Sequence, residues 1–515
     1  MLGELVLSRE GKAKAAELGG KTLVEMLESG YMAGRESALK CLCHLSSLES
    51  NAKLLVESGI LQALIRSLFA VGVNQLPMKL KEISATTLAN IVNSGTDLEK
   101  IRLDRDGNTI TSETVLHNLL HLISNTGPAI EAKLLRVLVG LASSPNAVSK
   151  IVKAIRSAGA TVSLIQFLEA PQKELQASSV KLLYHLCPHM GQDLVHGLHV
   201  ATGQLGTLVR MLEFSGITEE QAAAAKLIAN LPIEDTNLTR VLLREGALSA
   251  VLKQLNDLSQ GVIQVGGRRF VNDFKEGLVG ILYRCTYLLH DDNMLALAQA
   301  HNLTSLFTKL LSPDGIDEVR CLSALAMANM SLYSRALSTE PEPVILRPGL
   351  LACLRPSMPK KVVGLCKVHG GVCSAKLTFC LHEAGAVVPL VVCLEHQNMR
   401  VVESALKALS TLLMDGQNNG NIEGGIQVLN NAGAIQPILD IMREHRTDNA
   451  QQQSVSIVEC ILRDDDMART ILRDANVHTA LVEAFRYGNN QTKQMAEKAL
   501  KHLNKIPSFS GVFAR

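Results

Sequence analysis

A short phrase recurs along the 515-residue chain: a polar residue, a small residue, a glycine, and then an apolar helical stretch. The clearest copies are ESGILQALIRSL at 57–68, SAGATVSLIQFL at 157–168, ATGQLGTLVRML at 201–212, REGALSAVLKQL at 244–255, EAGAVVPLVVCL at 383–394 and NAGAIQPILDIM at 431–442. Two further copies, at 300–311 and 474–485, have asparagine in place of the glycine. Glycine and asparagine tolerate a left-handed backbone, so each copy predicts a tight turn before a helix.

The copies recur at nearly constant spacing. The intervals are 44 residues from Gly159 to Gly203, 43 from Gly203 to Gly246, 48 from Gly385 to Gly433 and 43 from Gly433 to Asn476. A helical repeat of about 40–47 residues is typical of armadillo and HEAT arrays. The 100 residues between Gly59 and Gly159 leave room for a degenerate copy at 111–123, and Gly19, 40 residues before Gly59, predicts the start of an N-terminal unit.

A second, longer helix follows each phrase after a polar gap. Its apolar residues recur at i, i+3, i+4 and i+7, the stripe that a stacked helix buries. These helices are predicted at 36–48, 174–186, 219–231, 317–330, 400–413 and 490–503. A glycine turn between a short and an apolar helix, followed by a longer helix, matches an armadillo unit better than a two-helix HEAT unit. We therefore predict an all-α fold, an armadillo-repeat right-handed superhelical solenoid of about 9–11 repeats, formed by residues 1–515 as a single array.

Two irregular insertions interrupt the period. Residues 256–275 contain adjacent glycines and arginines and lengthen the Gly246–Asn302 interval to 56 residues. Residues 331–380 contain five prolines between 341 and 359 and several cysteines, and lengthen the Asn302–Gly385 interval to 83 residues. Prolines this dense prevent a long uninterrupted helix. Residues 504–515 are predicted to be a C-terminal tail.

Composition excludes several classes of function. Hydrophobic residues make up 47% of the chain but aromatic residues only 3%, with no Trp, so the core is predicted to be aliphatic. A net charge of +2 and few aromatic side chains argue against nucleic-acid binding. No apolar run approaches the ~20 residues of a membrane span. Eleven cysteines, mostly in apolar helical patterns, are expected to be reduced thiols of an intracellular protein. No phosphate-binding loop, HExxH or GxSxG motif is present, so this chain alone is predicted to be non-catalytic.

One local cluster has the spacing of metal ligands. Cys366, His369 and Cys373 form a C-x2-H-x3-C pattern, and Cys380 or His382 could supply a fourth ligand. Cys353 lies upstream. The alternative is a loop that packs its thiols against neighbouring helices. No cofactor is otherwise expected, and a structural zinc ion bound by Cys366, His369, Cys373 and Cys380 stays open.

The long third helices predict a row of basic and hydrogen-bonding groups along a concave groove. Basic residues stand four positions before an Asn, His or similar residue, on the same helix face. The predicted partner-binding residues are Lys40, His44, Asn90, Arg136, Lys181, His185, Lys226, Asn230, Asn329, Lys407 and Lys498. This row suits an extended, acidic or phosphorylated partner segment. The alternative is an ordinary solvated helix face.

A more specific resemblance lies in the second insertion. The segment GLCKVHGGVCS at 364–374, followed by CLHEAGAVVPLVVCL at 380–394, resembles the armadillo region of plant U-box E3 ubiquitin ligases of the senescence-associated type. The C-terminal sequence SFSGVFAR at 508–515 adds to the resemblance. In that family a U-box recruits a ubiquitin-charged E2 enzyme and the armadillo array selects the substrate.

The resemblance implies a substrate- or partner-recognition region that binds protein substrates or regulatory proteins. No Cys-Pro-Ile-containing U-box segment precedes the first repeat, so we expect contact with E2 only through a missing U-box, while full-length family members are ubiquitin transferases. It also implies a cytoplasmic location, with peripheral plasma-membrane association as an option. The alternatives are a stand-alone armadillo scaffold, or a membrane-peripheral adaptor that uses Arg268, Arg269, Lys501 and Lys505. An importin-type groove is disfavoured because it needs Trp.

Overall fold

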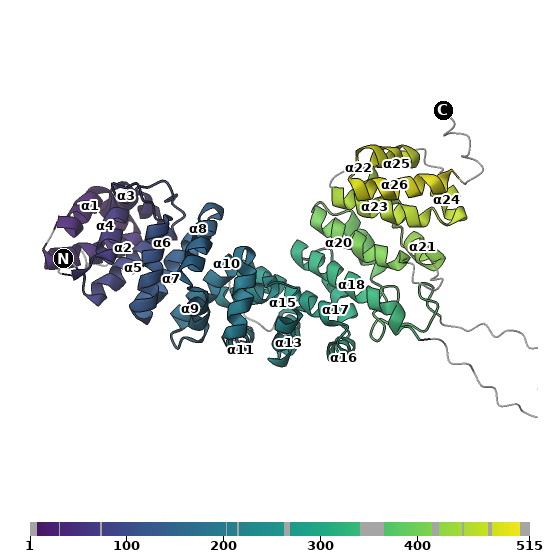
Figure 1. The fold of residues 1–515 in the computed structure, drawn as a ribbon, viewed down its shortest axis with the longest axis horizontal. Helices are drawn as coiled ribbons and strands as arrows, with labels where there is room; N and C mark the ends of the chain where they lie inside the picture. The colour runs from purple at the N-terminus through teal and green to yellow at the C-terminus, as the bar shows by residue number, and fades with distance from the viewer. Residues whose placement is uncertain are drawn as a thin grey trace, which may run out of the picture. The chain divides into compact units, whose positions relative to one another are not determined.

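The computed structural model describes residues 8–29, 31–72, 75–201, 203–213, 216–261, 268–339, 365–414, 422–444, 448–471 and 476–504. Helices dominate these residues (Figure 1). Within the described ranges the β-structure is limited to one isolated antiparallel bridge between Thr339 and Val372. The predicted all-α fold class is confirmed.

The chain divides into two compact units, Met1–Leu278 and Val279–Arg515, and the boundary lies inside helix α15. The helices of the first unit are α1 (Arg9–Ser29), α2 (Met32–Ser46), η2 (Glu49–Asn51), α3 (Ala52–Glu57), α4 (Ile60–Phe69), α5 (Met78–Val92), α6 (Glu113–Asn125), α7 (Pro128–Ala142), α8 (Pro145–Ala158), α9 (Thr161–Gln166), η4 (Phe167–Glu169), α10 (Lys173–Val200), α11 (Gln204–Met211), α12 (Glu219–Asn230), α13 (Thr236–Arg244), α14 (Ala247–Ser259) and the start of α15 (Arg268–Cys285).

The second unit continues the same alternation of short and long helices. Its helices after α15 are η5 (Thr286–Leu288), α16 (Asp292–Ala300), α17 (Leu303–Leu310), α18 (Asp317–Leu337), α19 (Val387–Leu394), α20 (Met399–Ser410), η7 (Thr411–Leu413), α21 (Ile422–Asn431), α22 (Ile435–Glu444), α23 (Asp448–Ile461), α24 (Asp465–Ile471), α25 (Asn476–Tyr487) and α26 (Asn490–Leu503).

In most repeats a left-handed residue lies between the first and second helices. In the repeat formed by α3, α4 and α5, Gly59 has φ +87° and ends the short helix, so α4 can turn back against α5. Helix α4 then buries Ile60, Leu61, Leu64 and Leu68. The predicted left-handed turns are confirmed at Gly59, Gly159, Gly203, Gly246, Gly385 and Gly433, with φ between 63° and 102°, and at Asn302, with φ 48°. This three-helix unit is the armadillo repeat.

The third helices of successive repeats pack side by side within each unit. In the described part of the chain these third helices are α2, α5, α7, α10, α12, α15, α18, α20, α23 and α26. Within the first unit, α5 packs between α2 and α7, and α10 packs between α7 and α12. Within the second unit, α20 packs between α18 and α23, and α23 contacts α26. These ten helices agree with the predicted repeat number. That they form a single array over 1–515 stays a prediction.

Two local predictions differ from the structure. Gly19 does not begin a repeat but lies in the middle of α1, because the helix formers on both sides outweigh the ~1 kcal/mol cost of a helical glycine. The helix predicted at 174–186 continues to Val200 as α10. It bends at Met190 (φ −142°, ψ 33°), next to Pro188, whose ring and missing N–H disrupt the helical hydrogen bonds.

The two predicted insertions are only partly within the described residues, and their bounds stay a prediction. Helices α14 and α15 occupy both ends of 256–275, and 262–267 lies outside the described residues. Helix α18 extends to Leu337, 340–364 lies outside the described residues, and 365–386 forms a non-helical segment. Of the predicted tail only Asn504 is described. No single described helix is long and apolar enough to cross a membrane; only the pair Pro145–Ala158 and Thr161–Glu169, bent by 103°, reaches that length and apolarity together.

Candidate functional site

The third helices of the first unit line a groove of about 880 Å³, which we call the α10 groove. It lies along α7, α10 and α12 and the turns beside them. Its lining residues are Asn93, Arg136, Val139, Lys173, Glu174, Gln176, Ala177, Ser178, Lys181, Met211, Thr218, Glu219 and Glu220. Two predicted binding residues, Arg136 and Lys181, therefore lie in one cavity. Most of these residues are polar or charged, and Val139, Ala177 and Met211 add apolar contacts.

Lys181 is held by two carboxylates of the next repeat. Its Nζ lies 2.5 Å from Glu219 Oε2 and 3.1 Å from Glu220 Oε1, and the lysine side chain is 22% exposed. Thr218 caps α12 with a reciprocal hydrogen-bond pair to Gln221, which fixes the first turn that carries both glutamates. Burial raises the pKa of Glu220, but hydrogen bonds and the Lys181 charge outweigh this effect and lower it overall.

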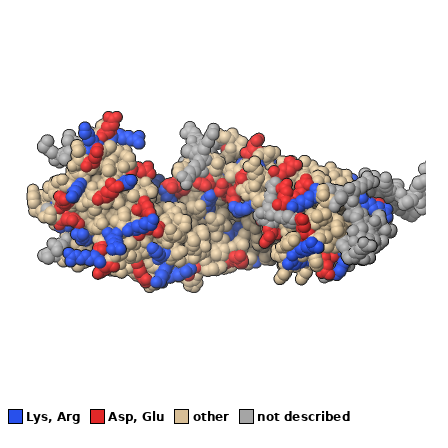
Figure 2. All heavy atoms as spheres, turned by 90° about the horizontal axis from the view of Figure 1, so that it is seen from above, with Lys and Arg blue, Asp and Glu red and all other residues tan. Residues whose placement is uncertain are grey.

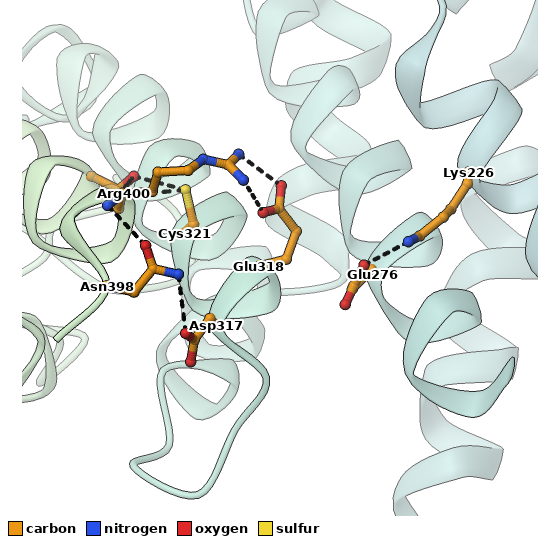
Figure 3. Close-up of polar contacts among 8 residues, drawn as sticks. Lys226, Glu276, Asp317, Glu318, Cys321, Asn398 and Arg400 are labelled. Carbon is orange, nitrogen blue, oxygen red and sulfur yellow. Dashed lines mark hydrogen bonds and ion pairs between the residues drawn. The ribbon is translucent and has the colours of Figure 1, made fainter. Parts of the chain in front are cut away.

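The same pairing recurs between other third helices of the first unit. Arg136 Nη1 on α7 lies 3.8 Å from Glu174 Oε1 on α10, and Lys133 also contacts that carboxylate. Lys226 Nζ on α12 lies 2.8 Å from Asp273 Oδ1 on α15. The same Nζ lies 2.8 Å from Glu276 Oε2 on that helix (Figure 3). Each cation meets an acid on the following third helix, in the first turn of α10 for Arg136 and further along α15 for Lys226. Lys and Arg are accordingly interspersed with Asp and Glu on the face drawn in Figure 2.

Burial and ion pairing act in opposite directions on Lys226. Burial alone would lower the pKa of this lysine, but the hydrogen bonds to Asp273 and Glu276 raise it above its ordinary value. Lys226 is therefore charged across the neutral range, and its charge is compensated within the fold. Lys40 is likewise paired, with Glu36 one turn earlier on α2 at 2.7 Å.

Two of the predicted asparagines hydrogen-bond to the preceding repeat. Asn90 Nδ2 on α5 donates to Ser46 Oγ on α2 at 3.1 Å. Asn329 Nδ2 on α18 donates to Thr286 Oγ1 on η5 at 3.0 Å. Such hydrogen bonds typically contribute about 1 kcal/mol each to the free energy of unfolding. These side chains join neighbouring repeats.

The remaining predicted residues are not gathered in the α10 groove. His44 is exposed and lines a separate, mostly apolar pocket of about 340 Å³ beside Leu18. Asn230, Lys407 and Lys498 are exposed, and neither lysine has an ion pair with the described residues. His185 is half-buried beside the Tyr184 ring, and burial lowers its pKa against the opposing effect of Glu219.

The sequence prediction missed the acidic half of the groove. Glu174, Glu219 and Glu220 all stand in the first turn of a third helix, where a negative charge also stabilises the helix dipole. The first-turn position of these glutamates was the sequence feature that could have indicated the acidic half of the groove. The pairing itself spans 38 residues between Lys181 and Glu219, so it follows only once the repeats are stacked.

A second candidate site lies in the segment after 340–364. Cys366, His369, Cys373 and Cys380 each present one ligand atom, and these atoms all lie within 4.8 Å of one another. The structure therefore brings Cys380 into the predicted cluster, in place of the alternative His382. Cys353 lies outside the described residues. Hydrogen bonds from the Cys366 and Cys380 thiols lower the pKa of Cys373, and the same interactions raise the pKa of Cys380, so the cluster favours one thiolate at Cys373.

The fold and the groove define the class of this chain, an α-helical armadillo-repeat scaffold with a candidate partner-binding groove. No protein-family model matches it. The chain is similar to U-box domain-containing protein 44 of Arabidopsis thaliana, with 46% identity over 517 residues that cover 99% of this chain and 63% of that protein. U-box domain-containing protein 24 of Oryza sativa subsp. japonica is 44% identical over 99% of this chain and 64% of its own length. The predicted resemblance to plant U-box proteins is confirmed.

The chain spans less than two thirds of the length of the curated relatives it matches. Among solved structures, an engineered protein of the Northeast Structural Genomics Consortium, target OR497, aligns with a TM-score of 0.61 and 18% identity. That alignment covers 94% of this chain and 98% of the engineered protein. It supports the repeat fold.

Proposed function

We propose that this chain is the partner-recognition region of a plant U-box E3 ubiquitin ligase, and that it binds an extended segment of a protein substrate or regulator in the α10 groove. The similarity to plant U-box proteins over 99% of the chain supports the ligase context. The α10 groove carries the binding proposal, because it is a cavity of about 880 Å³ lined by side chains from three successive third helices.

The charge pattern of the groove restricts the partner. Lys181 is already paired with Glu219 and Glu220, and Arg136 faces Glu174. A purely acidic segment gains little binding free energy in the groove, because it has to displace the carboxylates of Glu174, Glu219 and Glu220 from their cations. An extended segment that places an acidic or phosphorylated side chain at Lys181 and a basic side chain at Glu174 satisfies both halves of the groove.

In this division of roles a U-box transfers ubiquitin and this chain recognises the partner. The proposed location is the cytoplasm, with peripheral association with the plasma membrane as an alternative. It predicts no self-ubiquitination when this chain alone is incubated with E1, E2 and ubiquitin. Self-ubiquitination by the isolated chain would overturn the division of roles. A stand-alone scaffold without a ligase partner is the alternative, and a U-box encoded upstream in the same transcript decides between the two.

Site-specific crosslinking tests the groove. A photocrosslinking p-benzoylphenylalanine is placed at Lys173, an exposed lysine that lines the groove, and in a control at Lys153, an exposed lysine outside it. In plant cells we expect discrete crosslinked proteins from position 173 that are absent from position 153. Lys181→Glu should remove these adducts. Identical adducts from both positions, or adducts that survive Lys181→Glu, contradict binding in the groove.

A further inference from the structure

We propose that Cys366, His369, Cys373 and Cys380 form a structural zinc site of the Cys₃His type, which closes the non-helical segment 365–386. Cys366 Sγ lies 3.7 Å from Cys380 Sγ and 3.6 Å from His369 Nδ1, and Cys373 Sγ lies 3.3 Å from the same nitrogen. Tetrahedral zinc with Zn–S of about 2.3 Å and Zn–N of about 2.0–2.1 Å places its ligand atoms roughly 3.5–3.8 Å apart. The three distances are close to the edge lengths of such a tetrahedron, and all four ligand atoms lie within 4.8 Å of one another.

The arrangement is unlike a disulfide or a set of buried core thiols. The two sulfurs at 3.7 Å are far from the bonding distance of about 2.05 Å. Cys321, a buried thiol elsewhere in the described chain, contacts a hydroxyl group, with its Sγ 2.9 Å from Ser404 Oγ. Here three thiols and one imidazole nitrogen converge instead, and three soft sulfur ligands with one nitrogen are the donor set that zinc prefers.

The backbone between the first three ligands is folded into a tight knuckle. The Gly370 amide donates to Cys366 O at 2.8 Å, and the Cys366 amide donates to Gly371 O at 2.8 Å. Gly370 has φ +70°, which a residue with a side chain rarely adopts. This turn brings Cys366, His369 and Cys373 to one side, as short-spaced zinc ligands require.

Neighbouring elements hold the knuckle and the fourth ligand in place. The Val372 amide donates to Thr339 O at 2.8 Å, so the knuckle pairs with the residues that follow α18. Cys373 Sγ also lies 3.2 Å from Ser338 Oγ. Cys380 is fully buried just before the turn into α19. A zinc ion bound here ties the end of α18 to the start of the next repeat, in a segment that has no helix of its own.

Metal analysis of the purified full chain tests the site. After expression in zinc-supplemented medium and extensive dialysis, we expect about one zinc per chain by atomic emission. Less than a tenth of an equivalent overturns the proposal. The double variant Cys373→Ser/Cys380→Ser is expected to lose the zinc. Cys43→Ser, a half-buried cysteine in α2 distant in sequence from the cluster, is the matched control and should retain it. Zinc retained by the double variant also overturns the assignment.

Cobalt substitution separates a specific site from loss of folding. Co²⁺ added to the zinc-free chain should give the visible absorption of tetrahedral cobalt with thiolate charge-transfer bands. His369→Cys preserves four ligands and should still bind Co²⁺, with bands shifted toward a four-thiolate spectrum. An octahedral spectrum for the wild-type chain, or an unshifted spectrum for His369→Cys, contradicts ligation by these four residues. These measurements do not involve the α10 groove, so their outcome is independent of the proposed partner binding.

Discussion

Arg400 on α20 and Glu318 on α18 form a two-pronged ion pair, with Nη1 2.6 Å from Oε2 and Nη2 3.0 Å from Oε1 (Figure 3). The two residues are 82 positions apart in sequence. Beside them, Asn398 Nδ2 donates to Asp317 Oδ2 at 3.0 Å. Helices α18 and α20 are therefore neighbouring third helices, although 83 residues separate Asn302 from Gly385.

This pair gives the first prediction. Both side chains are partly exposed, so a double-mutant cycle of Arg400→Ala and Glu318→Ala should give a coupling energy of about 0.5–1 kcal/mol, measured by urea unfolding. Arg400→Lys keeps the charge but loses the second hydrogen bond, and should lose part of the coupling. Salt at molar concentration should weaken the coupling between Arg400 and Glu318. Zero coupling at low salt contradicts the paired geometry.

Sequence reasoning predicted the helices and turns of this fold well, because each depends on residues close together in the chain. The predicted 490–503 helix coincides with α26, and Asn302 adopts the expected left-handed backbone. The partners of the groove lysines were not predictable in the same way. Lys181 meets Glu219 only because α10 and α12 stack side by side, and their register depends on the packing of both repeats.

The distinction between a turn glycine and a helical glycine gives the second prediction. Gly246 has φ +86° and Gly19 is helical, and a Cβ added at either position meets no atom within 4 Å. Gly246→Ala should therefore lower the free energy of unfolding by about 1–2 kcal/mol through backbone strain alone. Gly19→Ala should raise it by roughly 0.5–1 kcal/mol. Thermal unfolding of both variants checks the prediction, and equal signs for the two contradict it.

Lys226 gives the third prediction. Its side chain is 19% exposed and balances both Asp273 and Glu276. Lys226→Met leaves two neighbouring carboxylates without their cation, so the free energy of unfolding should fall by about 1–3 kcal/mol. Lys153→Met is the control, because Lys153 is exposed and pairs only at the surface with Glu113; it should unfold like the wild type.

The deficit of the Lys226→Met variant should also depend on pH. Because the pKa of Lys226 is raised, the stabilisation is complete below the ordinary lysine pKa of 10.5 and is lost as pH rises from there through the folded-state value. The wild type therefore keeps this contribution throughout the neutral range. The deficit of the variant should therefore be constant between about pH 6 and pH 9 and shrink only at alkaline pH, where the wild type loses the Lys226 charge. A deficit that changes within the neutral range contradicts this electrostatic origin.

His185 gives the fourth prediction. Burial lowers its pKa below the ordinary 6.5, although the Glu219 charge opposes the shift. As pH falls below about 6.5, the unfolded chain takes up a proton at this position while the folded chain resists it. The unfolded state then binds more protons, so stability falls with decreasing pH, by at most about 1.4 kcal/mol per pH unit. His185→Gln should flatten this slope in urea unfolding between pH 7 and pH 5. Tyr184→Phe preserves both His185 and the aromatic ring beside it, at 5.2 Å between ring centroids, and should keep the wild-type slope. An equally steep slope in His185→Gln would show that other groups cause the acid sensitivity.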